Sequence, residues 1–352
     1  MTFSGDDRIP ILPPSPQSVT LQDVARAAGV TIGTASKAMN GRGKLRLETR
    51  ERVRAEARRL GFRFRELELD VISQRGVMIG VLTTDNYGRF SIPLLTGIED
   101  AFGSRPVCAV LCNSRDQMRE QQQIELLLSR QIDGIIVSAR REDPRPPIDV
   151  GRVPIPVVYA FAQATDPNTL SVLPDDEQGA RLATEHLVVQ AGRRQFAHIT
   201  GPSYFEAVHL RERAMRQVLA EHGLQVPEHR VLSGPWQESW GYTAAKYLFE
   251  QDSSIDALFC GSDQLARGAV EALRERGVRI PDDVAVVGFD NWEPIACATR
   301  PALTTVDMNL TEVGRYAGKY LLALLGGEVR SGIVRLPCSL VIRDSSVPAH
   351  RN

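Results

Sequence analysis

The sequence predicts a multi-domain protein in which a small all-α head precedes an α/β core of two doubly wound lobes. Three observations lead to this prediction. The chain has 352 residues, more than one domain usually contains. Apolar residues between positions 20 and 60 recur at helical spacing. From Gly76 onward, short apolar runs alternate with amphipathic segments in two series, a pattern typical of parallel sheets with right-handed crossovers.

Residues 20–40 are predicted to form two short helices around a tight turn. Thr20 and Thr31 are candidate N-caps, because a hydroxyl there accepts a bond from a free backbone N–H. Gly29 is expected to end the first helix, since glycine enters the left-handed conformation without steric cost. The apolar face of the first helix comprises Leu21, Val24, Ala25 and Ala28. The facing residues of the second helix are Ala35, Ala38 and Met39.

The outer face and N-terminal end of the second helix carry Ile32, Gly33, Thr34, Ser36 and Lys37. In a helix-turn-helix unit this end enters the DNA major groove. An ordinary helical hairpin would show the same pattern, so the charge decides between them. Residues 20–65 contain 12 Lys or Arg and 4 Asp or Glu, a net +8, whereas the whole chain is −1. A basic module on an acidic body favours phosphate contact.

The head also resembles a known family. The stretch TLQDVARAAGVTIGTASKAMNG, followed by ETRERVRAEARRLGF in a predicted third helix at 48–60, is similar to the DNA-binding head of lactose-repressor (LacI/GalR) family transcriptional regulators. The resemblance implies a homodimeric repressor that contacts a near-palindromic double-stranded operator; a tetramer is left open. The predicted DNA-contacting residues are Thr20, Thr31, Ile32, Gly33, Thr34, Ser36, Lys37 and Asn40.

The linker at 65–75 departs from the family pattern. Relatives have a proline and an Ala/Arg/Leu-rich hinge helix whose leucine enters the minor groove. Here Glu66, Glu68 and Asp70 alternate with apolar residues, which is a strand period. Three carboxylates near DNA would also be repelled. An edge strand, a dimer contact and an irregular linker are the alternatives.

The core elements follow from the apolar runs. The first series is predicted to have strands at 76–84, 106–114, 133–139 and 154–161 and helices at 93–103 and 119–130. The second has helices at 177–192, 210–223, 239–251 and 263–277 and strands at 195–201, 230–234, 257–261 and 284–290. The segments 301–309, 311–327, 333–337 and 339–343 complete the fold, and the last of them are expected to cross between lobes.

Four segments of the core resemble the effector-binding core of the same family and the periplasmic sugar-binding proteins: 133–137, 179–202, 261–291 and 300–317. Ligands of such folds bind in the crevice at the carboxyl ends of the strands. The resemblance implies that a small effector, a sugar or a related metabolite, controls operator affinity from there.

The predicted effector-binding residues are Phe90, Arg211, Trp236, Ser262, Asp263 and Asp290. A guanidinium at position 211 can make two hydrogen bonds to hydroxyls, phosphate or carboxylate, and the matching family arginine contacts effector. The carboxylate of Asp290 follows a strand and can accept from ligand hydroxyls, while Trp236 can stack on a sugar ring. The alternatives are a surface arginine, a capping aspartate and a packed core tryptophan. Ala160 and Phe161 stand where relatives often carry an aspartate, which leaves room for a less polar effector.

The rest of the sequence bounds the other possibilities. Five scattered Cys indicate reduced thiols, and neither a secretory signal nor a membrane span is recognised, so a cytoplasmic protein is expected. No catalytic motif, metal-ligand cluster or phosphate-binding loop is found, so neither enzyme activity nor a cofactor is expected. The alternative function is a solute-binding protein of a transport system. The predicted boundaries are 1–19 for a disordered tail, 20–64 for the head, 65–75 for the linker and 76–346 for the core, with lobe one at about 76–174 plus 304–331 and lobe two at about 175–303 plus 332–346.

Overall fold

The computed structural model describes residues 21–39, 45–60, 76–85, 87–139, 143–151, 153 and 155–347. The chain divides into two compact units, 1–75 and 76–352. Two predicted DNA-contacting residues, Thr20 and Asn40, lie outside the described residues, as do the tail and the linker. The same holds for the side chains of Leu21, Ser36 and Met39.

The described part of the head has the three predicted helices, α1 (Leu21–Ala27), α2 (Ile32–Met39) and α3 (Leu47–Leu60). Thr31 caps α2, because the backbone N–H of Thr34 donates to its hydroxyl at 3.2 Å. Gly29 follows α1 with φ at +62°, as predicted for a helix stop. One small core joins the helices, built from Val24, Ala25, Ala28, Ala35, Ala38, Val53 and Ala57. Its many alanines let the helix backbones approach closely.

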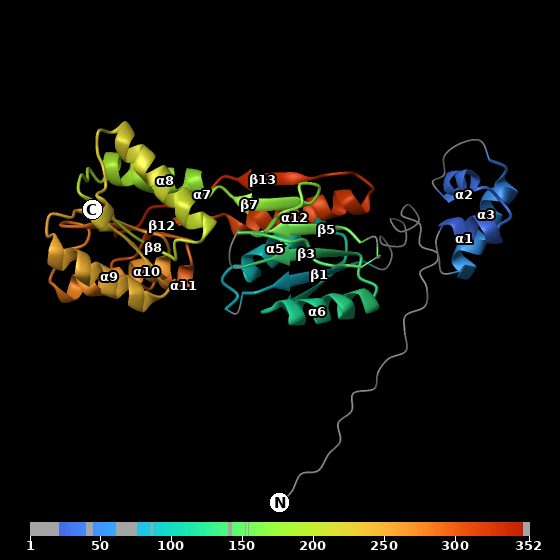
Figure 1. Ribbon diagram of the computed structural model, residues 1–352, viewed down its shortest axis with the longest axis horizontal. Coiled ribbons are helices and arrows are strands. Elements are labelled where there is room, and N and C mark those ends of the chain that lie inside the picture. The colour runs from blue at the N-terminus through green and yellow to red at the C-terminus, as the bar shows by residue number, and fades with distance from the viewer. Residues whose placement is uncertain are drawn as a thin grey trace, which may run out of the picture. The chain divides into compact units, whose positions relative to one another are not determined.

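Lobe one is built on a parallel sheet with the strand order β13-β7-β5-β3-β1-β2 (Figure 1). Its strands are β1 (Val77–Thr83), β2 (Val107–Asn113), β3 (Gly134–Ser138), β5 (Val157–Ala160), β7 (Leu170–Pro174) and β13 (Gly332–Leu336). Its helices are α5 (Ser91–Phe102), α6 (Gln117–Ser129) and α12 (Leu310–Leu325). A separate two-stranded ribbon joins β4 (Pro144–Arg145) and β6 (Gln163–Ala164).

Lobe two has the strand order β14-β12-β11-β10-β8-β9, and β14 runs antiparallel to β12. Its strands are β8 (Phe196–Thr200), β9 (Val231–Ser233), β10 (Ala257–Cys260), β11 (Ala285–Phe289), β12 (Thr304–Asp307) and β14 (Ser339–Val341). Its helices are α7 (Asp176–Glu185), which continues as a π-helical turn (His186–Gln190), α8 (Glu206–Glu221), α9 (Glu238–Gln251), α10 (Asp263–Glu275) and α11 (Glu293–Ala296), with a 3-10 turn at Glu228–Arg230.

Each lobe packs one pair of helices through reciprocal glycines. A Cβ on Gly97 of α5 would collide with the carbonyl of Thr311 in α12, and a Cβ on Gly314 of α12 would collide with the carbonyl of Leu94. In lobe two, Gly241 of α9 and Gly268 of α10 are equally close to the partner backbone. These contacts bring the backbones of each helix pair into direct contact, which only glycine allows at these positions.

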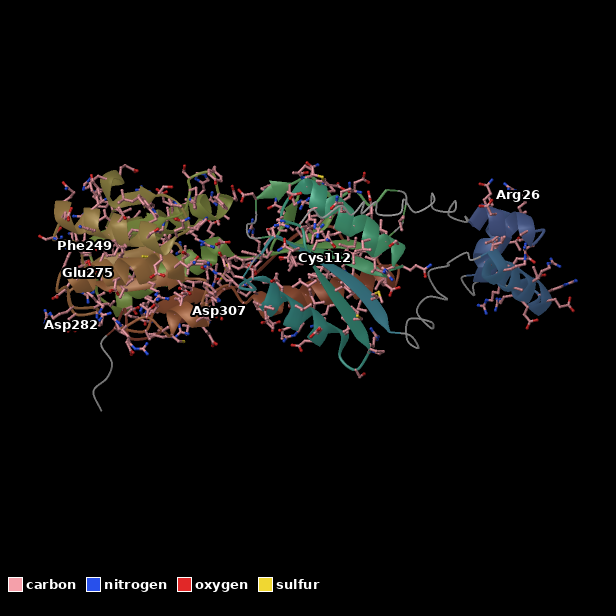
Figure 2. All side chains as sticks on the ribbon, turned by 90° about the horizontal axis from the view of Figure 1, so that it is seen from below. Arg26, Cys112, Phe249, Glu275, Asp282 and Asp307 are labelled. Carbon is pink, nitrogen blue, oxygen red and sulfur yellow. The ribbon has the colours of Figure 1, made fainter. Side chains whose placement is uncertain are left out.

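The assignment of the last strands to lobes differs from the prediction. Strand β12, placed in lobe one from the sequence, pairs with β11 in lobe two, and β13, placed in lobe two, pairs with β7 in lobe one. The chain therefore crosses between the lobes three times, after β7, after β12 and after β13. Figure 2 labels Asp307, the last residue of β12, at the side of lobe two that faces lobe one.

The crossings are tied to one another by hydrogen bonds. The side-chain amide of Asn309 donates to the carbonyl of Pro337 at 2.8 Å, and the backbone N–H of Cys338 donates to the side chain of Gln178 at 2.9 Å. Asn309 adopts a left-handed conformation with φ at +51°. The three crossing segments are thus joined to one another by hydrogen bonds where the chain passes between the lobes.

Candidate nucleic-acid interface and inter-lobe site

The N-terminal end of α2 presents the residues that the sequence predicted for DNA contact. Ile32 is 50% exposed, and Thr31, Gly33 and Lys37 are also exposed. The hydroxyl of Thr34 lies 2.9 Å from that of Thr31, so these two side chains are already hydrogen-bonded to each other. A Cβ on Gly33 would meet no atom of the described residues within 4 Å. The outer face of α2 is therefore accessible, with the large apolar side chain of Ile32 in its first turn and the cation of Lys37 in its last turn.

Part of the positive charge of the head is neutralised by its own carboxylates. Arg26 pairs with Asp23 at 3.4 Å, and Arg59 pairs with Glu56 at 2.8 Å. Figure 2 shows Arg26 projecting from the surface of the head. Both pairs are exposed, so their energetic contribution is small and a phosphate can replace the carboxylate. The exposed pairs do not prevent the head from binding a polyanion.

Arg89 spans the space between the two lobes. It lies in lobe one just before α5, and its guanidinium forms an ion pair with the carboxylate of Asp290 in lobe two. Its other terminal nitrogen donates to the side-chain oxygen of Gln264 in α10 at 2.9 Å. The guanidinium carbon lies 4.8 Å from the ring centroid of Phe90 and 5.2 Å from that of Trp292. Two of the predicted effector residues, Phe90 and Asp290, therefore meet through a residue that the sequence interpretation did not select.

Asp85 fixes the loop that carries Arg89. Its carboxylate accepts from the backbone N–H groups of Tyr87, Phe90 and Ser91 at 2.8 to 3.0 Å and from the hydroxyl of Ser91. Burial raises the pKa of Asp85, but the backbone bonds outweigh burial and hold this pKa below its usual value. The carboxylate thus stays ionised and orients the loop toward lobe two.

Burial lowers the pKa of Arg89 to about 10, against the opposing effect of the Asp263 carboxylate. The nearby Arg211 cation lowers this pKa further. The guanidinium remains charged at neutral pH, so it needs a counter-charge. Asp290 supplies it, with 11% of the arginine side chain and 6% of the aspartate side chain exposed.

The loop that holds Asp290 is strained. Asp290 has φ at +108° and Asn291 has φ at +49°, both in the region that disfavours residues with a side chain. The backbone N–H of Asp290 donates to the carbonyl of Val306, and the side chain of Asn291 bonds Asp307 and Arg343. Strain of this kind persists only where the surroundings enforce it, and it concentrates at functional sites.

Ser262 and Asp263 have different structural roles. The hydroxyl of Ser262 caps α10 by accepting from the N–H of Leu265 at 3.3 Å. The carboxylate of Asp263 is fully buried and accepts from Thr305 at 2.5 Å and from the N–H of Trp292 at 2.7 Å. Burial raises the pKa of Asp263 to about 6. Both of its oxygens have partners, so it supports the Trp292 loop from below.

Arg211 is buried and bound within lobe two. Its Nε donates to Asp176 at 2.5 Å, its Nη1 donates to the carbonyl of Gly261 at 2.7 Å, and its guanidinium stacks on Phe289 at 3.6 Å. Its Nη2 has the sulfur of Met308 at 3.9 Å, a weak acceptor. One terminal nitrogen therefore has donor capacity left for a ligand. The alternative of a surface arginine is wrong, since 4% of the residue is exposed.

Trp236 lies over the carboxyl ends of two strands. A Cβ on Gly201, which follows β8, would collide with its ring, and one on Gly261, which follows β10, would contact it at 3.3 Å. The ring also meets Phe205 edge to face at 5.9 Å. Trp236 is half-buried, so part of its indole remains accessible beside the strand ends.

Several buried polar atoms of the two lobes have no hydrogen-bond partner among the described residues. They include Ser138 Oγ at the end of β3, Thr200 Oγ1 at the end of β8, Asp176 Oδ2 and Arg89 Nε. Buried polar atoms are usually satisfied, so such a group marks a position where a bound polar molecule would be stabilised. Sequence interpretation missed all four residues, although the position of Ser138 and Thr200 at strand ends was a usable signal.

The described residues contain no group of three or more His, Cys, Asp or Glu side chains able to hold a metal ion. Their five cysteines are free thiols. None of the described helices combines the length and apolarity that crossing a membrane requires. The site offers polar and aromatic binding groups.

Comparisons with known proteins agree with this organisation. The family model for bacterial regulatory proteins of the lacI family matches residues 20–63, and that for a periplasmic binding protein-like domain matches residues 184–346. Catabolite control protein A from Priestia megaterium is 30% identical over 332 residues, which cover 94% of this chain and 99% of that protein. The HTH-type transcriptional repressor CytR from Escherichia coli (strain K12) is 28% identical over 331 residues, covering 94% of this chain and 96% of the repressor.

Solved structures show the same arrangement of domains. The crystal structure of the lac repressor dimer bound to operator and the anti-inducer ONPF has a TM-score of 0.63 and 25% identity, and the match covers 94% of this chain and 100% of that one. The complex of the transcriptional regulator CelR with cellobiose has a TM-score of 0.65 and 26% identity, and the match covers 93% and 99%. These relatives contain the head as well as the core, which favours a regulator over a transport solute-binding protein. The chain therefore belongs to the lacI family of bacterial regulatory proteins, and it is a transcriptional regulator.

Proposed function

We propose that this regulator is a homodimeric repressor whose affinity for a near-palindromic operator is controlled by a sugar or related metabolite bound between the two lobes. The observation that carries the proposal is the group of residues where the lobes meet: the rings of Phe90 and Trp292 and the strained loop of Asp290 surround Arg89. A ligand that binds one lobe arrangement more tightly shifts the population of the dimer toward it. Since operators are chromosomal, the protein acts in the cytoplasm.

On the DNA side, we assign the second helix of the head to the major groove. Lys37 bonds a base edge or a phosphate, and Ile32 contacts a thymine methyl group. Thr31, Thr34 and Ser36 position phosphates, and Thr20 and Asn40 belong to the same surface. Gly33 has no side chain with which to contact a base, so it contributes no direct readout.

The dimer has support from the edge of lobe one. Strand β2 ends the sheet, and its Val110 and Leu111 are 37% and 41% exposed. On the neighbouring helix α6, Met118 and Leu126 are 73% and 51% exposed. An edge strand that has no further partner among the described residues, beside exposed apolar side chains, is a surface that association would cover. Two heads related by a two-fold axis match two half-sites of an operator.

On the ligand side, we assign Phe90, Trp236 and Asp290 to the walls of the crevice. Cellobiose in the CelR complex supports the sugar class. The ring of Phe161 packs against that of Phe90 in a tilted arrangement with ring centroids 5.0 Å apart, which makes one wall apolar. This wall suits a ligand that has an apolar face as well as hydroxyls. Arg211, Ser262 and Asp263 then support the residues that contact the ligand.

The test is a binding experiment on the full chain. An operator is selected from random duplexes, and its affinity is measured by fluorescence anisotropy over a KCl series. Repression through phosphate contacts predicts a steep fall in affinity with salt. A panel of mono- and disaccharides and nucleosides is then screened for thermal stabilisation and for an effect on operator affinity. Saccharide binding with no affinity for any duplex would contradict the proposal.

A further inference from the structure

The contacts of Arg89 indicate a function in the geometry of the core. The residue belongs to lobe one, yet both terminal nitrogens of its guanidinium bind lobe two, at Asp290 and at Gln264. The stacking partners come from both sides as well, with Phe90 in lobe one and Trp292 in lobe two. Ion-pair, hydrogen-bond and ring contacts between the lobes therefore converge on this one side chain.

The two ends of this contact are held in place by their own lobes. Four bonds to Asp85 order the loop of residues 87–91 on the side of lobe one. On the side of lobe two, Asp290 is held by a bond to β12, and Asp263 anchors the N–H of Trp292. Because both ends are preorganised, the bond loses little conformational entropy when it forms.

A second polar contact crosses the crevice at another point. The carboxylate of Asp143 in lobe one accepts from the backbone N–H of Glu206, the first residue of α8 in lobe two, at 3.2 Å. The N-cap residue of α8, Phe205, has no side-chain acceptor to offer. Lobe one thus caps a helix of lobe two, which favours the same spacing of the lobes as Arg89 does.

We propose that Arg89 is an intramolecular clasp that holds the two lobes at a fixed spacing by binding Asp290 and Gln264. The clasp occupies a carboxylate that the proposed function assigns to the ligand, so a ligand that binds Asp290 has to release Arg89 or supply another anion to it. In this respect the clasp rests on the proposed function. Its effect on lobe spacing does not, because it follows from contacts within the chain.

The experiment measures the distance between the lobes in the full chain by pulsed electron paramagnetic resonance. The exposed Cys108 and Cys297 are replaced by Ser, while the buried Cys112, Cys260 and Cys338 remain unreactive. Spin labels are attached at Arg130→Cys in lobe one and Lys246→Cys in lobe two, both exposed positions. Labelled chains are diluted with unlabelled chain, so that distances within one protomer dominate.

The parent is expected to give one narrow distance, and Arg89→Met is expected to lower the population at this distance relative to longer ones by about tenfold. Asp290→Asn should give the same change, and the double variant should change no further, because both substitutions break one interaction. The matched control is Arg230→Met. It removes an Arg–Asp pair of lobe two, with Asp252, in which 8% of the arginine side chain is exposed. The control should keep the parent distance.

An unchanged distance in Arg89→Met, or an equal change in Arg230→Met, would overturn the clasp. Operator affinity is measured on the same variants to separate the clasp from the proposed function. A changed distance with unchanged operator affinity would leave the clasp intact and contradict the control of DNA binding by the lobes. Absence of operator binding in the parent would contradict the proposed function and would leave the clasp unaffected.

Discussion

Asp263 and His198 should make opposite contributions to the pH dependence of stability. The folded-state pKa of Asp263 is about 6, against 3.8 for an exposed carboxyl, because the group is buried. The folded state therefore binds this proton more tightly. The contribution of Asp263 to the free energy of unfolding is fully present below pH 3.8 and is lost as the pH rises through 6. The difference of about 2 pKa units corresponds to about 3 kcal/mol.

His198 acts in the other direction. Burial lowers its pKa from 6.5 to about 4, and its Nδ1 bonds the carbonyl of Phe259 at 2.8 Å. The folded state therefore disfavours the proton. The contribution of His198 is fully present above pH 6.5 and is lost as the pH falls through 4, again by about 3 kcal/mol. Between pH 4 and 6 the two contributions should nearly cancel in the parent.

The variant Asp263→Asn separates the contribution of Asp263 from that of His198. Asparagine can still accept from the N–H of Trp292 and donate to the hydroxyl of Thr305, so the hydrogen bonds of the site are retained. The unfolding free energy of the variant, relative to the parent, should rise by about 3 kcal/mol between pH 4 and 6. His198→Asn should show the opposite trend over pH 4 to 6.5. Taking differences from the parent removes the contributions of all other titrating groups.

The assay is urea unfolding followed by tryptophan fluorescence at several pH values. All three tryptophans, Trp236, Trp240 and Trp292, belong to lobe two, so the signal reports on the lobe that contains both groups. A constant difference between Asp263→Asn and the parent across this pH range would refute the reasoning, since it would mean that Asp263 does not titrate there.

Three further results are expected. Lys37→Ala should weaken binding to the selected operator by about tenfold and lower the salt slope by about 1, with thermal stabilisation by any saccharide unchanged; an equal loss of both would argue against separate domains. Arg211→Met should lower the unfolding free energy by about 3 to 5 kcal/mol, because it leaves Asp176 buried without its counter-charge, and Arg211→Met with Asp176→Asn should recover part of it in urea unfolding. Replacing Glu66, Glu68 and Asp70 together by Ala should strengthen operator binding if the linker approaches the groove; unchanged anisotropy would place the linker away from DNA.

The head was predictable because its determinants are local. A cap at Thr31, a stop at Gly29 and small residues at Val24, Ala35 and Ala38 lie within one short stretch, and each acts on its immediate neighbours. The first two helices follow from the periodicity of that stretch, and the third follows from the periodicity of residues 48–60. The exposure of this surface could also be predicted, because an exposed helix face needs no partner elsewhere in the chain; the DNA contacts of its residues stay predictions.

The assignment of β12 and β13 to lobes could not be predicted in the same way. Both segments are short, with the sequences TTVD and GIVRL, and neither has a pattern that assigns it to one of the two sheets. Their partners, β11 and β7, lie at different distances along the chain. Which sheet each segment joins depends on the path that the chain takes between the lobes. The periodicity of a sequence does not reveal that path.

The same limit applies to the site, where it changes how a substitution is interpreted. Position at the end of a strand identified Asp290, but its counter-charge, Arg89, comes from the other lobe. Family resemblance identified Arg211, but its carboxylate partner, Asp176, lies 35 positions earlier. Replacing either predicted residue alone leaves a buried charge without its partner, so the first effect measured is on stability or on lobe spacing. A role in ligand binding must therefore be read from the paired variants, in which the buried charge and its partner are removed together.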